Sequence, residues 1–115
     1  MAENRKVYSL KKSSDFLFLT KNGIKLKPVR WLTVYYMNSE DGKTEFGITA
    51  SRKTGNSVTR NKLKRWVRSC AKSSEMPKSF FGKKSVFVFR AQAENFFSEM
   101  EFKQFREIFY NIQFT

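Results

Sequence analysis

Residues 51–72 decide the fold, and they read SRKTGNSVTRNKLKRWVRSCAK. The run holds eight Lys and Arg residues and no Asp or Glu. Thr54-Gly55-Asn56 is typical of a turn, because Gly and Asn tolerate positive φ better than other residues. Asn56 or Ser57 can then cap a helix, since a short side-chain oxygen accepts a hydrogen bond from an unpaired N–H of the first turn. Nothing interrupts a helix from there to about Lys72.

Helical spacing divides this predicted helix into two faces. One face should be buried and comprises Thr59, Leu63, Trp66, Val67 and Cys70. The opposite face comprises Asn61, Lys64, Arg65, Arg68 and Lys72, and Arg60 lies at the edge of the apolar stripe. An ordinary lysine-rich helix face is simply solvated. Here no carboxylate neutralises the cations, so we favour phosphate binding.

The same run resembles the signature of the bacterial ribonuclease P protein family, roughly S-K-K-x-G-x-A-V-x-R-N-R-x-K-R-x-x-R. The matching positions are Ser51, Lys53, Gly55, Val58, Arg60, Asn61, Lys64, Arg65 and Arg68. Arg52, Ser57 and Lys62 depart from it. Lys62 keeps the charge of the family's arginine but loses its planar, bidentate recognition of phosphate. The resemblance extends more loosely from about Leu10 to Ile112.

Bulk properties agree with a nucleic-acid-binding domain. A length of 115 residues predicts one domain over residues 1–115, and 40% hydrophobic residues predict a folded chain. A formal charge of +13 points to nucleic acid or an anionic surface. Residues 1–90 hold 21 cations against 6 acids, whereas residues 91–115 hold 2 against 4, so the binding surface should come from the first part of the chain.

The single cysteine and the lack of long apolar segments bear on the redox state and the location of the protein. Cys70 is alone, which excludes an internal disulfide, and it is most simply a core residue. We see no secretory segment and no apolar stretch of membrane length, so a cytoplasmic protein is expected.

The N-terminal part predicts a basic arm and a short helix. The arm, residues 1–12, should be ordered only in part. Ser13 or Ser14 should cap the helix, and Gly23 should end it. The Asp15-Phe16 pair also looks like the first helix of the ribonuclease P protein family, which implies that Phe16 faces an RNA-binding cleft. A plain core phenylalanine is the alternative.

Three strands and a last helix complete the pattern. Residues 31–37 and 44–51 are predicted strands around Asp41-Gly42, a hairpin signal, and Gly47 would permit close approach by another backbone. Residues 85–90 should form a central strand. Ser98 and Glu101 form a capping-box pattern that opens an amphipathic helix over about 99–113.

These elements predict an α+β fold: a single-domain, two-layer sandwich with a mixed central sheet and helices. The expected order is α-β-β-α-β-α, with room for an extra short strand. Strand–helix–strand crossovers are almost always right-handed. The resemblance implies the opposite, because the ribonuclease P protein family is a left-handed exception.

The chain lacks the usual catalytic groups. It contains no His, and its two Asp residues, Asp15 and Asp41, are explained by a helix start and a turn. No group of carboxylates suggests a two-metal nuclease. We therefore predict that the protein alone is not a catalyst.

The resemblance implies a role in ribonuclease P, an endoribonuclease whose RNA subunit holds catalytic magnesium and removes the 5′ leader of precursor tRNA. The partners would be ribonuclease P RNA and precursor tRNA. The implied RNA-binding residues are Arg52, Lys53, Asn56, Arg60, Asn61, Lys62, Lys64, Arg65 and Arg68. The implied leader cleft comprises Phe16, Tyr35, Thr49 and Ser51, where an aromatic ring would stack on bases with little sequence preference.

Two other classes stay open. A pure binding module, such as a ribosomal or chromosomal protein, would share the basic helix. A peripheral membrane protein is less favoured, because the apolar helix face should be consumed by the core. Dimerisation is compatible with the sequence, but nothing indicates it.

Overall fold

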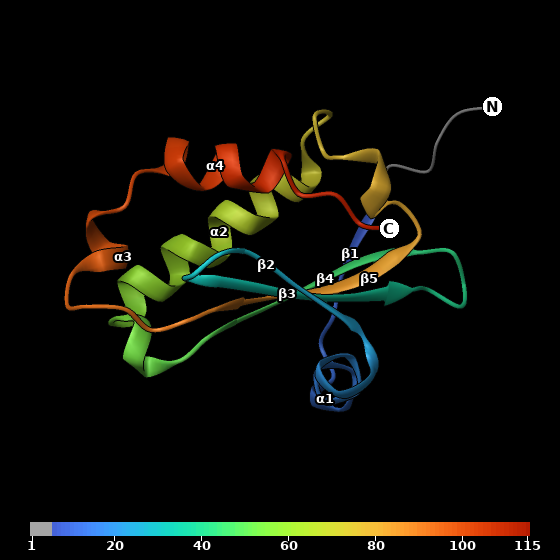
Figure 1. The fold of residues 1–115 in the computed structure, drawn as a ribbon, viewed down its shortest axis with the longest axis horizontal. Coiled ribbons are helices and arrows are strands. Elements are labelled where there is room, and N and C mark those ends of the chain that lie inside the picture. The colour runs from blue at the N-terminus through green and yellow to red at the C-terminus, as the bar shows by residue number, and fades with distance from the viewer. Residues whose placement is uncertain (1–5) are drawn as a thin grey trace.

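The computed structural model describes residues 6–115, which form one sheet with helices on both faces (Figure 1). No helix in this range is long and apolar enough to cross a membrane. The α+β class is confirmed. The elements are β1 (Val7–Ser9), α1 (Ser13–Asn22), β2 (Ile24–Val29), β3 (Leu32–Asn38), β4 (Thr44–Ala50), α2 (Ser57–Lys72), β5 (Lys83–Phe89), α3 (Phe96–Glu99) and α4 (Phe102–Tyr110).

The sheet has the strand order β1-β4-β5-β3-β2. Its central strand β5 pairs parallel to β4 and antiparallel to β3. The predicted hairpin is therefore wrong, because β5 lies between the two strands that the turn connects. Gly42 does form a turn with φ 75°. Across the gap, Ser39 N donates to Gly82 O at 2.8 Å and Gly82 N donates to Thr44 Oγ1 at 2.9 Å.

The two edge strands were not predicted as separate elements. β1 pairs parallel to β4 and lies inside the predicted arm, of which residues 1–5 fall outside the described range. β2 pairs antiparallel to β3, with an irregularity between Leu26 and Val29. Its apolar residues alternate with Lys25 and Lys27, which is a strand period, but Pro28 interrupts it. Proline removes a ladder donor and is tolerated because β2 is an edge strand.

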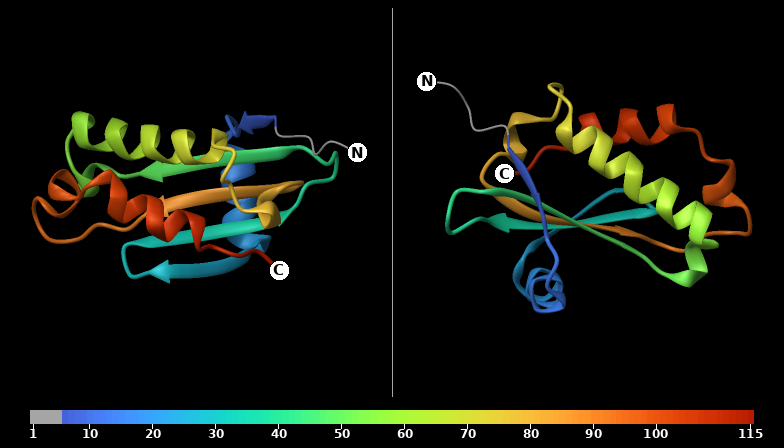
Figure 2. Two further views of the ribbon diagram at one scale, coloured as in Figure 1. Left: turned by 90° about the horizontal axis from the view of Figure 1, so that it is seen from above. Right: turned by 180° about the vertical axis from the view of Figure 1, so that it is seen from behind.

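The β4–α2–β5 crossover is left-handed, as the resemblance implied. In the left panel of Figure 2 the helices α2 and α4 face the viewer, β4 and β5 both point to the left, and β5 lies below β4. Turned so that the strands point upward, β5 stands to the left of β4. A right-handed crossover would place it to the right.

The two faces of the sheet are covered unequally. Under α2 and α4 lies the main core, where rings such as Phe46, Phe87 and Phe109 stack on one another. On the other face α1 covers a small core of Leu10, Leu19 and Val86. Because a single ten-residue helix cannot cover the whole face, part of that face stays open.

Two predicted helix starts are wrong. α1 begins at Ser13 itself, and its N-cap Lys12 makes no side-chain cap hydrogen bond, although Gly23 ends the helix as predicted. The last segment forms two helices, because Met100 is extended with ψ 137° and separates them. α4 is capped by Glu101, which forms a capping box with Gln104 one turn after the predicted box.

Candidate nucleic-acid interface

The start of α2 is built as the sequence predicts. Gly55 takes φ 155°, and a Cβ there would lie 2.9 Å from Thr59, so only glycine fits. Asn56 Oδ1 accepts from Thr59 N at 2.9 Å, which confirms the predicted cap. The 3₁₀ turn Arg52–Thr54 precedes it and leaves Arg52 and Lys53 exposed. Two cations therefore stand at the positive end of the helix dipole.

The outer face of α2 carries charge that no residue of the described range neutralises by an ion pair. Thr59, Leu63, Val67 and Cys70 are buried, as predicted. Asn61, Arg65, Arg68 and Lys72 are exposed, and Lys64 is half-buried. Within residues 6–115 none of the α2 cations forms an ion pair. Cations crowded in this way repel one another, so the face is suited to a polyanion.

Arg60 lies at the edge of this face. The residue is half-buried, and its Nε is a buried donor with no hydrogen-bond partner within the described part of the chain. Such a donor carries an uncompensated desolvation cost. An acceptor arriving from outside the protein would remove that cost.

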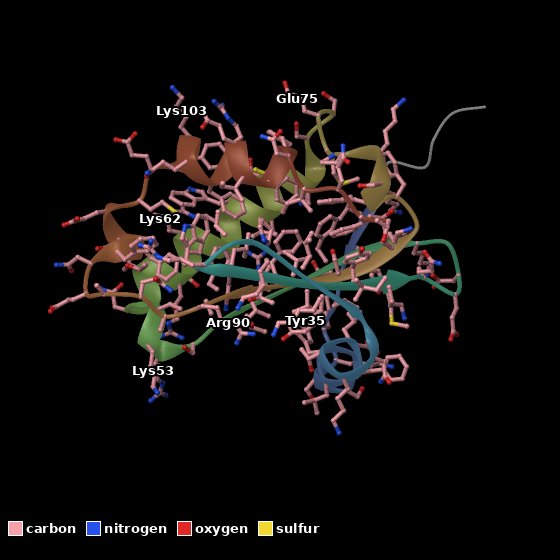
Figure 3. The ribbon with its side chains drawn as sticks, viewed as in Figure 1. Tyr35, Lys53, Lys62, Glu75, Arg90 and Lys103 are labelled. Carbon is pink, nitrogen blue, oxygen red and sulfur yellow. The ribbon has the colours of Figure 1, made fainter. Side chains whose placement is uncertain are left out.

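Lys62 is turned away from the interface. Its Nζ donates to Phe97 O at 2.7 Å, to Ser98 O at 3.0 Å and to Met100 O at 3.3 Å. The same atom lies 4.9 Å from the ring centroid of Trp66. An ammonium group has three N–H donors, so these carbonyls occupy all of them. Figure 3 shows Lys62 on the helix side of the sheet, away from Tyr35 and Arg90. The arrangement does not support the RNA contact predicted for Lys62, and we assign the residue to the α3–α4 corner instead.

The predicted leader cleft lies on the open face of the sheet. Phe16, Tyr35 and Thr49 line one hollow of about 370 Å³ beside α1. Ser51 and Lys64 line an adjoining hollow of about 450 Å³ under α2. Thr49 belongs to both. The structure thus brings the four predicted cleft residues to one continuous surface, and it connects that surface to the basic helix through Lys64.

Gly47 explains how Phe16 reaches this surface. A Cβ at Gly47 would lie 2.7 Å from two ring atoms of Phe16. The close approach that we predicted at Gly47 is therefore made by an aromatic side chain of α1, not by another backbone. Phe16 stays half-buried, with one side on the sheet and another on the hollow.

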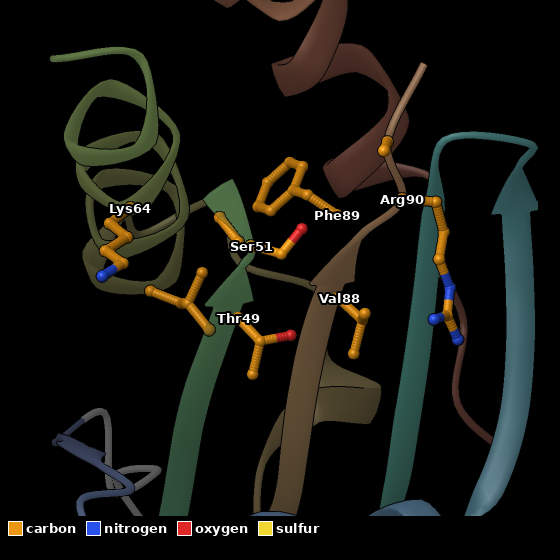
Figure 4. Close-up of a pocket in the computed structure, with 9 residues that line it drawn as sticks. Thr49, Ser51, Lys64, Val88, Phe89 and Arg90 are labelled. Atoms are coloured by element: carbon orange, nitrogen blue, oxygen red, sulfur yellow. The ribbon is translucent and has the colours of Figure 1, made fainter. Parts of the chain in front are cut away.

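Sequence reasoning missed Arg90, which follows β5 and lines both hollows. Its Nε donates to Thr33 Oγ1 at 3.2 Å, and its Nη2 donates to Tyr35 Oη at 3.2 Å. Figure 4 shows its side chain lying across β3, with Lys64, Thr49 and Ser51 on the far side of Val88. The sequence feature that could have identified Arg90 is its position as an isolated cation directly after the apolar run Val86–Phe89.

The described residues offer no obvious metal site. Within residues 6–115 there is no group of three or more His, Cys, Asp or Glu side chains that could hold a metal ion. The one cysteine, Cys70, is buried, and burial raises the pKa of its thiol to about 11. The donor set of the described residues does not fit a resident catalytic cation.

Comparisons with known proteins agree with this geometry. A family model described as Ribonuclease P matches residues 5–113. The ribonuclease P protein component of a Thermotoga strain is 32% identical over 100 residues, which cover 85% of this chain and 82% of the relative. The component from Macrococcus caseolyticus is 40% identical over 63 residues, and the match spans only 55% of that relative's length.

Solved structures show the same fold. The RNase P protein from Thermotoga maritima superposes with a TM-score of 0.74 at 28% identity, covering 92% of this chain and 98% of that one. A Staphylococcus aureus RNase P protein mutant with defective mRNA degradation activity gives a TM-score of 0.72 at 29% identity, covering 87% and 80%.

Proposed function

Because the chain belongs to the ribonuclease P protein family, we propose that it binds the catalytic RNA of ribonuclease P together with the 5′ leader of precursor tRNA, and so assists removal of the leader. The reaction is endonucleolytic hydrolysis that yields the mature 5′ end of tRNA. The RNA subunit performs the scission, and the protein acts as part of the holoenzyme, in the cytoplasm.

The main support for this proposal is the position of Lys64, which joins the basic helix to the hollow on the sheet. Lys64 comes from the basic helix α2, yet it lines the same hollow as Ser51 and Thr49. One surface therefore offers unneutralised cations beside a groove with aromatic walls. Structured RNA needs the cations, because its phosphates repel one another. A single strand needs the aromatic groove, because its bases are free to stack.

Each part has a separate task. Arg65 and Arg68, exposed on α2, contact phosphates of the catalytic RNA and lower the repulsion between it and the precursor. Phe16 and Tyr35 present ring faces to the leader, and each stacked base contributes about 1–3 kcal/mol without sequence preference. Arg52 and Lys53 extend the basic surface at the start of α2.

Magnesium enters through the RNA subunit. When bound there, it supplies the charge stabilisation that phosphodiester hydrolysis needs. The residues of this chain contribute by screening charge and by positioning the leader, since they lack a cluster of metal ligands within the described range.

The test is reconstitution with a bacterial ribonuclease P RNA and a precursor tRNA at low magnesium. We expect faster leader removal that requires both components, and an apparent affinity that falls steeply with salt as counterions are released. Binding of the RNA without any change in cleavage would support a general RNA-binding module and overturn the proposal.

A matched pair of variants locates the surface. Joint substitution of Arg60, Asn61 and Arg65 by Ala should weaken the assistance more than joint substitution of Lys103 and Arg106, two exposed cations on α4. Thermal unfolding of both variants separates loss of contact from loss of fold. Equal losses of assistance in two folded variants would show that α2 is not the interface.

A further inference from the structure

Arg30, in the turn between β2 and β3, is an exposed cation that the protein holds in one place. Its Nε donates to Gln92 Oε1 at 3.2 Å, and its guanidinium carbon lies 5.7 Å from the ring centroid of Phe96. Gln92 is fixed in turn, because its Nε2 donates to Ala91 O at 2.9 Å and to Arg90 O at 3.3 Å. A free surface arginine samples many rotamers, so these contacts organise the side chain at an entropic cost.

The guanidinium of Arg30 keeps most of its binding capacity. An arginine side chain has five N–H donors, and the bond to Gln92 uses one of them. Within residues 6–115 the other four make no hydrogen bond, and Arg30 forms no ion pair. A cation that is organised without an internal anion is suited to an anion from outside the protein.

This position lies outside the proposed leader cleft. Arg30 lines neither hollow of that cleft. The β2–β3 turn lies at the same end of the sheet as α3 and the start of α2 (Figure 1). Gln92 lines a different hollow there, of about 200 Å³, together with Lys53 and Asn56. Glu94 is the one acid among the residues that line this hollow, and it forms no ion pair within the described range.

The surroundings of Arg30 favour base-paired RNA over a single strand. A single strand binds through bases that stack on open rings. Arg30 lies over the Phe96 ring, and Trp31 and Phe97 contact the same ring at centroid distances of 6.2 and 5.0 Å, so little ring surface is left for a base. Base-paired RNA is instead recognised largely through its backbone phosphates and 2′-hydroxyls. We propose that Arg30 binds a backbone phosphate of base-paired RNA, as a contact separate from the leader cleft and from the outer face of α2.

This inference rests on the proposed function, and two RNAs could supply the phosphate: the catalytic RNA and the tRNA part of the precursor. The experiment therefore has two arms. The first measures filter binding of the protein to ribonuclease P RNA alone over a range of salt concentrations. The second measures, over the same range, the affinity of holoenzyme assembled with saturating protein for mature tRNA, which has no leader.

Arg30→Gln should weaken binding about tenfold in one of the two arms, since a charge-assisted hydrogen bond to phosphate is lost. In that arm the slope of log affinity against log salt should fall by about 0.9, the value for one phosphate of a duplex. The arm that changes identifies the RNA. Arg30→Lys keeps the charge and should keep the slope, although it loses the bidentate geometry and with it part of the affinity.

Arg106 provides the matched control. It is also an exposed arginine over a phenylalanine ring, with its guanidinium carbon 5.9 Å from the Phe102 centroid, but it lies on α4. Arg106→Gln should leave the slope unchanged in both arms. Thermal unfolding of each variant establishes that it is folded.

The outcomes separate this inference from the proposed function. If the unaltered protein does not assist leader removal in reconstitution, the proposed function is refuted, and the ligand assigned to Arg30 with it. If the unaltered protein assists and Arg30→Gln keeps both slopes, only the inference is refuted, and Arg30 serves to hold the β2–β3 turn against the segment after β5. Equal falls of slope in Arg30→Gln and Arg106→Gln, or a lost slope in folded Arg30→Lys, would also overturn the inference.

Discussion

Replacing Lys62 by Met should destabilise the fold without weakening RNA binding. α3 ends at Glu99, and the last carbonyls of a helix have no partner inside it. Lys62 supplies donors to Phe97 O and Ser98 O in this last turn and to Met100 O just beyond it. Methionine would keep the apolar stem against Trp66 and remove the ammonium group.

The expected loss of unfolding free energy in Lys62→Met is the difference between the lost hydrogen bonds and the relieved desolvation of the charge. A hydrogen bond to a charged group contributes about 1.5–3 kcal/mol, but three bonds to one ammonium are not additive. Burial lowers the pKa of Lys62, because desolvation disfavours its charged form, and this opposes part of the gain from the hydrogen bonds. The net loss in Lys62→Met should be about 2 kcal/mol, because partnerless carbonyls remain. In a chain of this length that lowers the melting temperature by about 8 °C.

Urea unfolding followed by tryptophan fluorescence measures the loss, because Trp31 and Trp66 both lie at the packed corner. Filter binding to ribonuclease P RNA over a range of salt concentrations measures the affinity for RNA and its salt dependence. Lys64→Met is the control, and it should show normal stability and a smaller salt slope. The opposite result, normal stability and a reduced slope in Lys62→Met, would refute the structural role and restore Lys62 as an RNA contact.

Two other perturbations test the interior beside the site. Gly47→Ala places a methyl group 2.7 Å from the Phe16 ring, so it should cost about 1–3 kcal/mol in chemical denaturation, and a smaller side chain at position 16 should recover part of this. Burial raises the pKa of Cys70 from 9.0 to about 11. The folded state therefore keeps this proton where the unfolded state loses it, and the free energy of unfolding should fall as pH rises from 9 to 11. The fall should be smaller in Cys70→Ala. The remaining fall comes in part from Tyr110, because burial also raises the pKa of that side chain. An identical fall in both proteins would show that the thiol does not titrate differently on folding.

Features set by neighbouring residues could be predicted from the sequence. The cap at Asn56, the Gly55 turn and most of the two faces of α2 depend on a few consecutive positions and were predicted correctly. Trp66, which was predicted on the buried face, is half-buried. The same logic failed at the last helix. The segment contains two capping-box patterns, one starting at Ser98 and one at Glu101. The structure uses the second, and Lys62, more than thirty residues away, donates to Phe97 O and Ser98 O just before it.

Strand pairing lay beyond local reasoning. Asp41-Gly42 indicates a turn, but a turn says nothing about whether a third strand separates the two that it joins. The insertion of β5 depends on α2 covering one face and on the left-handed crossover, which the sequence pattern alone does not specify. The strand β2 was missed because Pro28 counts against a strand unless its outer edge is known to be unpaired.

The sequence by itself determined that α2 would be a capped helix with a buried stripe and an acid-free outer face, because helical spacing and side-chain charge are local properties. Only the tertiary structure decided which cations lie on the proposed RNA-binding surface. It turned Lys62 inward onto the carbonyls around the end of α3, and it brought Arg90 beside Tyr35, 55 positions earlier in the chain. The physical reason is that hydrogen-bond partners depend on distance in space, which the packing of the sheet creates and the order of residues does not contain.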